Sequence, residues 1–156
     1  MALSRSIRRR LRRLAEVGPA RRALMLEAVV CLVLARLGLI VVPFPKLARR
    51  LGHFVPPCDP RVSAARERGP QAALAVEIGW AVTRAARYLP FKAVCLPQAM
   101  AAQMMLRRRG VASVMHFGAA RGEEKPLDAH AWLDAAGVEV TGYPVGPKFA
   151  EIACFV

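Results

Sequence analysis

The sequence contains few aromatic and few acidic residues. Phe, Trp and Tyr make up 6% of the chain, and 11 Asp and Glu stand against 24 Lys and Arg, so the net charge is +13. Such a charge suits an anionic partner, whether nucleic acid, a membrane surface or an acidic peptide. No aromatic residue interleaves with the arginines at 8–10 and 12–13, although base stacking on single strands needs aromatics there. We therefore expect no nucleic-acid partner, and keep a basic RNA- or membrane-binding module as the alternative function.

Motifs for metal binding are also absent. The four cysteines include no CxxC pair, and the three histidines form no HExxH motif. This excludes zinc-finger and zinc-protease patterns, and we expect neither a metal nor an organic cofactor. Cys31, Cys58 and Cys154 are interpreted as inert reduced thiols, and His116 as a structural residue.

One long apolar run occupies residues 23–42, after a basic amphipathic segment at 4–17. The run is long enough to cross a bilayer, but it contains Glu27 and Arg36, which lie on opposite faces of a helix and cannot pair within it. Each charge would cost about 2.5–3.5 kcal/mol in the middle of a membrane. We expect a helix packed on the core or on a partner, with membrane association of the 23–42 helix as the alternative. No small-residue cleavage site clearly follows the run, so we expect a cytoplasmic protein without a signal peptide.

The remaining sequence predicts helices first and strands afterwards. Apolar residues recur at helical spacing over 70–89, and another helix begins near Cys95. Alternating β-rich segments then follow at 111–119, 127–134, 138–142 and 151–156. Because parallel neighbours need a long crossover connection, strands joined by loops this short must run antiparallel. The pattern predicts an α+β fold in a single domain, 1–156, with a helical part at 1–89 and a core at 90–156.

Cys95 lies at the N-terminal edge of its predicted helix, where Pro97 suits the first turn. Unpaired backbone N–H groups and the positive end of the helix dipole stabilise a thiolate at such a position. The same N–H groups can receive an oxyanion. On the strand at 127–134, His130 shares a face with the polar Asp128. A cysteine and a histidine in this arrangement favour a nucleophile and its general base.

The motif C-L-x-x followed by RRRG and then by A-H-A-W-L-D-x-x-G resembles the lasso-peptide biosynthesis B2 proteins. The resemblance extends to the N-terminal helices and the C-terminal tail. It implies a papain- and transglutaminase-like core that removes the leader from a ribosomally made precursor peptide, with Cys95 as nucleophile and His130 as base. It also implies an ATP-dependent lasso cyclase as a partner, and no cofactor. Because a domain this small has little room for a leader-binding module, we expect a separate leader-recognition protein of the RRE type. The 23–42 helix and the arginine-rich start are candidate docking surfaces.

The third member of the catalytic set is where the sequence departs from this family. If the AAG turn pairs Asp134 with Val138, His130 lies opposite Gly142, which has no side chain to offer. Asp128 is about 7 Å away along the same face and is the favoured orienter of the imidazole, with a backbone carbonyl or Thr141 as alternatives. The same fold could also carry out acyl transfer or amidase chemistry instead of peptide hydrolysis.

Overall fold

The computed structural model describes residues 18–122 and 126–156, so the basic segment predicted at 4–17 lies outside the described residues. The helices are α2 (Pro19–Val41), α3 (Phe44–Leu51), α4 (Pro60–Ala65), α5 (Ala72–Ala86) and α6 (Cys95–Arg107). The strands are β1 (Phe54–Val55), β2 (Val114–Arg121), β3 (Leu127–Ala135), β4 (Val138–Thr141) and β5 (Ala150–Phe155). Helices followed by a small sheet confirm the predicted α+β class.

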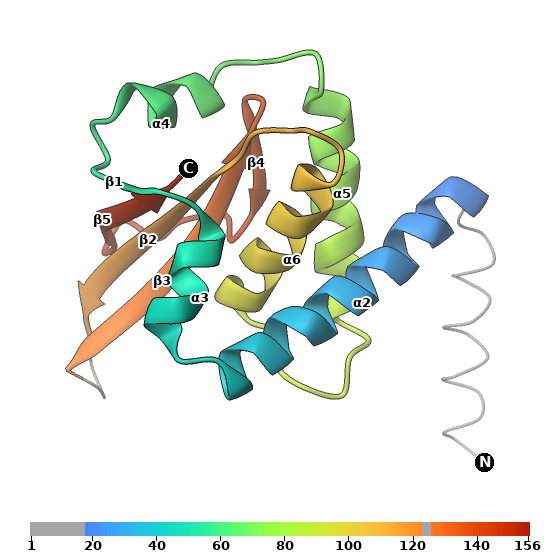
Figure 1. The fold of residues 1–156 in the computed structure, drawn as a ribbon, viewed down its shortest axis with the longest axis horizontal. Coiled ribbons are helices and arrows are strands. Elements are labelled where there is room, and N and C mark those ends of the chain that lie inside the picture. Colours follow the sequence, from blue (N-terminus) through green and yellow to red (C-terminus); the bar gives the residue numbers. More distant parts are fainter. Residues whose placement is uncertain (1–17, 123–125) are drawn as a thin grey trace.

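The five strands form one antiparallel sheet in the order β1-β5-β2-β3-β4. In Figure 1, α2, α5 and α6 lie together beside this sheet, and α4 lies over the end that carries β1 and β5. One core cluster joins the three helices to the sheet, and its fully buried side chains include Leu32, Ile78, Met105, Leu106, Met115 and Leu133. Truncating any of these leucines to alanine would cost about 2–5 kcal/mol.

The α2 helix confirms the predicted span and presents two different apolar faces. Its inner face is buried against α5 and α6 through Met25, Ala28, Cys31, Leu32 and Ala35. Its outer stripe is exposed, with Val30 at 58% of its full accessibility, and comprises Leu26, Val30, Leu34, Leu37, Ile40 and Val41. By length and composition α2 could cross a membrane. In the structure, however, its inner face is part of the protein core.

Ion pairs fasten α2 to its neighbours. Glu27 accepts two hydrogen bonds from the Arg109 guanidinium, at 2.9 and 2.6 Å, and Arg108 lies 3.5 Å away. Arg21 forms a similar bidentate pair with Glu77 of α5, in which Nε and Nη2 donate to the two carboxylate oxygens at 2.7 and 2.6 Å. From the sequence, we expected that Glu27 could not pair with Arg36 within its own helix. Its partner in the structure is Arg109, which lies beyond the C-terminal end of α6.

The β3–β4 hairpin differs from the predicted register. We expected Asp134 opposite Val138, but the structure pairs Asp134 with Glu139 and Ala135 with Val138. The physical reason is the turn: Ala136 and Gly137 both have positive φ, 50° and 74°, so the connection has two residues and not three. A bulge after Leu133 then moves Thr141 opposite Leu133. The strand predicted at 111–119 begins only at Val114, because the Val111 N–H still donates to Leu106 O and closes α6.

The Glu27–Arg109 pair generates a prediction about stability. Hydrogen bonds from Arg109 hold the pKa of Glu27 below its ordinary value, and partial burial opposes the shift only in part. A carboxyl with a lowered folded-state pKa stabilises the fold above its unfolded pKa and loses that effect as pH falls through the folded value. Glu27→Gln should therefore lower the free energy of unfolding by about 1–2 kcal/mol at pH 7.

The measurement is urea denaturation of wild type and variant between pH 7 and pH 3, with exposed Glu67→Gln as the control. The difference between wild type and Glu27→Gln should shrink below about pH 4, near the ordinary carboxyl pKa. A difference that stays constant over this range would contradict the ion-pair account.

Candidate functional site

Cys95 is the first residue of α6, as predicted, and its side chain is half-buried. Val94 precedes the helix in an extended conformation and supplies no side-chain cap. Pro97 has no N–H and the Gln98 N–H donates to Val94 O at 3.3 Å, which leaves the N–H groups of Cys95 and Leu96 for a ligand or an anionic sulfur. Gln98 secures the approach to the helix, because its side-chain amide donates to Ala93 O at 2.6 Å. Cys95 thus occupies an accessible, locally positive end of a well-anchored helix.

His130 lies in the half-buried first part of β3, and among the described residues its ring has one polar contact. The Nε2 atom is 2.6 Å from the carbonyl oxygen of Gly142. A carbonyl only accepts, so Nε2 must carry the proton that it donates. In the neutral ring this leaves the Nδ1 lone pair as the basic site. The sequence leaves a backbone carbonyl as one alternative to Asp128 for orienting the imidazole. In the structure, the Gly142 carbonyl is in contact with the ring.

Gly142 is at this position because no larger residue fits. Its φ is +86°, in the left-handed region, and an added Cβ would lie 2.5 Å from Ala131 O and 2.8 Å from the Trp132 Cα. The backbone therefore passes directly over β3, and this close approach is what brings the Gly142 carbonyl to the imidazole.

The Asp128 side chain has a partner other than His130. Its carboxylate forms an ion pair with Lys148 at 2.9 Å, and no contact with His130 is present among the described residues. Thr141, the other alternative, is buried, and its hydroxyl has no hydrogen-bond partner within the described chain. The orienting role of Asp128 therefore stays a prediction.

The elements that carry Cys95 and His130 are packed together. α6 contacts β3, and because α6 leads through a short connection into β2, which is antiparallel to β3, α6 runs in the same direction as β3. The N-terminus of a helix about 20 Å long then lies toward the beginning of β3. The cysteine end of α6 and the histidine half of β3 are thus at the same end of the molecule.

Side-chain alternation along β3 separates the two residues onto different faces of the sheet. Leu133 and Ala135 belong to the core that includes α6, whereas the His130 ring stacks on Trp132 at a centroid distance of 5.9 Å and packs on Phe149. No hydrogen bond joins Cys95 to His130 within the described residues. Because β4 pairs with β3 only at Leu133–Ala135, His130 lies on a stretch of β3 that β4 does not flank.

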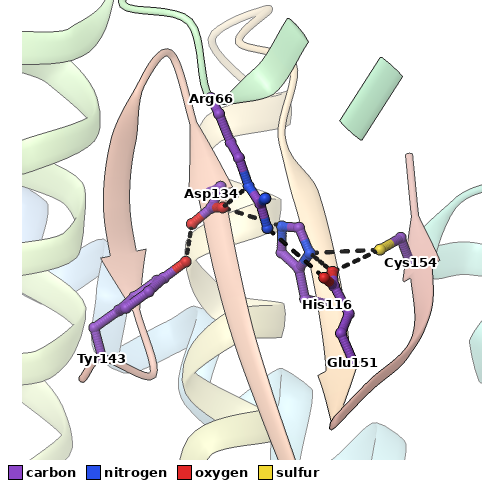
Figure 2. A network of polar contacts seen from close by, with 6 residues as sticks. All are labelled: Arg66, His116, Asp134, Tyr143, Glu151 and Cys154. Atoms are coloured by element: carbon purple, nitrogen blue, oxygen red, sulfur yellow. Dashed lines mark hydrogen bonds and ion pairs between the residues drawn. The ribbon is translucent and has the colours of Figure 1, made fainter. Parts of the chain in front are cut away.

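Sequence reasoning missed a second constellation, a buried polar network on the face of the sheet that carries His130. Figure 2 shows the imidazole of His116 between two carboxylates, with Nε2 3.2 Å from Asp134 Oδ2 and Nδ1 in contact with Glu151. Tyr143 donates its hydroxyl to Asp134, and Arg66 reaches both acids, at 3.3 Å from Asp134 and 3.8 Å from Glu151.

The groups in this network stabilise one another's protonation states. Burial disfavours ionisation of Asp134, but hydrogen bonds from His116 and Tyr143 outweigh it and hold the Asp134 pKa below its ordinary value. Burial and the nearby Asp134 carboxylate raise the pKa of Tyr143, which therefore remains a hydrogen-bond donor. The network links three strands of the sheet to Arg66, which follows α4.

Cys154 completes the network and gives it the outline of a Cys-His-Asp triad. Its Sγ is 3.4 Å from His116 Nδ1 and 3.0 Å from Glu151. The thiol is fully buried, and burial together with the Glu151 carboxylate raises its pKa to about 12. A thiol that neither ionises near neutral pH nor meets solvent does not act as a nucleophile. Half-buried Cys95 is the stronger candidate.

A cysteine at the N-terminus of a helix that packs on an antiparallel sheet, with a histidine on the next-but-one element, is the element order typical of a Cys–His enzyme core. The chain belongs to the transglutaminase-like superfamily, whose family model matches residues 38–154. Members of this superfamily are generally Cys–His enzymes, including cysteine peptidases and acyltransferases. No curated protein and no solved structure matches the chain.

Proposed function

We propose that this protein is a cysteine peptidase that removes the leader from a ribosomally made lasso-peptide precursor. The observation that supports the proposal most is the position of Cys95 at the free N-terminus of α6, packed on the strand that carries His130. The His130 Nε2 is tied to Gly142 O, which leaves Nδ1 to act as the base. The motifs around the two residues, which resemble the B2 leader peptidases, suggest the substrate.

The proposed chemistry needs only the two side chains and the helix terminus. The His130 Nδ1 takes the thiol proton of Cys95, and the thiolate forms a C–S bond to the carbonyl at the leader–core junction. The N–H groups of Cys95 and Leu96, at the start of α6, receive the oxyanion. As the C–N bond breaks, the imidazolium gives its proton to the leaving amine. Water, deprotonated by the same imidazole, then cleaves the thioester and frees the leader.

This mechanism requires a conformational change, because Cys95 and His130 lie on different faces of β3 and the Gly142 backbone covers this stretch of the strand. In the proposal, the Gly142 backbone moves aside and the His130 side chain turns around the edge of β3, which brings Nδ1 toward the end of α6. A precursor peptide bound across this edge would complete the arrangement.

Acyl transfer or amidase action is the second candidate, because the superfamily includes acyltransferases. The thioester intermediate would be the same, and only the acceptor would differ, an amine in place of water. The mass of the product separates the two reactions, since transfer creates a new amide bond and hydrolysis adds one water.

We further propose that the protein works in the cytoplasm with a separate leader-recognition protein, which presents the precursor, and with the ATP-dependent cyclase. The α2 outer stripe is the proposed docking surface for the recognition protein. It is apolar, it lies between the exposed cations Arg22 and Lys46, and most of α2 precedes the residues that the family model covers. An apolar partner groove with an acidic rim would complement it.

Replacing Cys95 should abolish leader removal. With precursor and recognition protein present, Cys95→Ser should lower the cleavage rate at least about 10³-fold, because loss of a catalytic nucleophile leaves only substrate binding and oxyanion stabilisation. Mass spectrometry of the precursor over time measures this. The matched control is Cys58→Ser, which alters an exposed cysteine and should leave the rate unchanged. Equal loss in both variants, or leader removal by Cys95→Ser at the wild-type rate, would contradict the assignment.

The docking proposal is tested by adding charge to the outer stripe. The double variant Val30→Glu with Leu34→Glu keeps the buried face of α2 intact and should lose the recognition protein in a pull-down, because a carboxylate cannot enter an apolar groove without a partner. Val76→Glu, on a residue of α5 with similar exposure, is the control and should retain it. Undiminished recovery by the double variant would place the docking surface elsewhere.

A further inference from the structure

We propose that His116, Glu151 and Cys154 form a binding site for a divalent transition-metal ion of the zinc class. Three donor atoms of three kinds, an imidazole nitrogen, a carboxylate oxygen and a sulfur, lie within 4.8 Å of one another. The inference concerns a different cluster from the Cys95 site and does not depend on the proposed peptidase activity.

The backbone is built to bring these donors together. His116 of β2 pairs directly with Cys154 of β5, and the register shifts so that Gly118 pairs with Glu151, which leaves Ile152 as an extra residue in β5. In a regular strand, residues three apart point to opposite faces, so Glu151 and Cys154 would diverge. The bulge turns both toward His116. This is why no sequence spacing revealed the cluster.

The donors match the chemistry of Zn²⁺. The ion prefers thiolate, neutral imidazole and carboxylate ligands, and three protein ligands leave a fourth position for water. A thiolate and a carboxylate together carry two negative charges, which balance the charge of the ion. Figure 2 places Glu151, Cys154 and the Nδ1 side of His116 around one point, with both β5 residues on the same side of the imidazole.

The surroundings supply the support that metal ligands need. Asp134 Oδ2 lies 3.2 Å from the Nε2 of His116, the carboxylate arrangement that fixes the tautomer and raises the basicity of a ligating imidazole. Arg66 approaches the second oxygen of Glu151, at 3.8 Å, and leaves Oε1 for the ion. A cavity of about 440 Å³ is lined in part by Arg66, Trp132 and Asp134, which are neighbours of the cluster.

Without an ion, the same three side chains are joined by hydrogen bonds. The Cys154 thiol donates to Glu151, and the His116 Nδ1–H also meets Glu151. Binding of the ion replaces both protons, which leave to solvent, with metal–sulfur and metal–nitrogen bonds, while Glu151 exchanges two hydrogen bonds for one metal bond. No change in oxidation state is involved.

Cobalt titration of the full chain under reducing conditions tests the site. Wild type should take up one equivalent of Co²⁺, with a near-ultraviolet band from sulfur-to-cobalt charge transfer, and Zn²⁺ should displace it. Cys154→Ser should lose the band and the tight uptake. The control is Cys31→Ser, which alters another buried thiol, located in α2, and should behave as wild type.

Glu151→Gln provides a second variant in case Cys154→Ser does not fold, because Glu151 is partly exposed and a glutamine fills the same space. It should keep the sulfur band but weaken Co²⁺ binding at least about tenfold, as loss of a direct ligand requires. Wild type that takes up no Co²⁺ or Zn²⁺, or a Co²⁺ band that survives in folded Cys154→Ser, would overturn the proposal. Neither result bears on Cys95, so the metal site and the peptidase activity are tested separately.

Discussion

The packing of α6 on β3 is the contact on which the rest of the structure depends. Ala99 and Ala102 of α6 and Leu133 of β3 are fully buried members of the same core cluster. This contact fixes the direction of α6 relative to the strands. It thereby brings the free N-terminus of the helix, with Cys95, to the half of β3 that carries His130, although the two residues are far apart in the sequence.

The two clusters of reactive side chains share this sheet but differ in environment. Cys95 lies half-buried at a helix end. Cys154, in contrast, is fully buried in contact with His116, and its thiol donates a hydrogen bond to Glu151. Trp132 connects the two regions, because its ring stacks on His116 at 5.4 Å and on His130 at 5.9 Å. A metal ion bound to His116 would therefore restrict the movement of the Trp132 indole, on which the ring of the candidate base His130 stacks.

Local signals in the sequence predicted the features that depend on neighbouring residues. The start of α6 at Cys95 and the extent of α2 follow from the helical spacing of apolar residues and from the prolines near the start of each helix. The strand register and the polar network depend instead on a two-residue turn and a bulge. A single inserted residue changes which side chains meet, so pattern alone could not have grouped His116 with Glu151.

The central claim is that Cys95 and His130 act as one unit, and the alkylation rate of Cys95 tests it without any substrate. Iodoacetamide is applied at pH 6 to wild type, His130→Ala and the control His53→Ala, and the labelled cysteine is identified by mass. If the imidazole activates the thiol, the Cys95 rate should fall by about 10²-fold in His130→Ala, within the usual range for a positioned base, and should not change in His53→Ala. Equal rates in all three proteins would contradict the account.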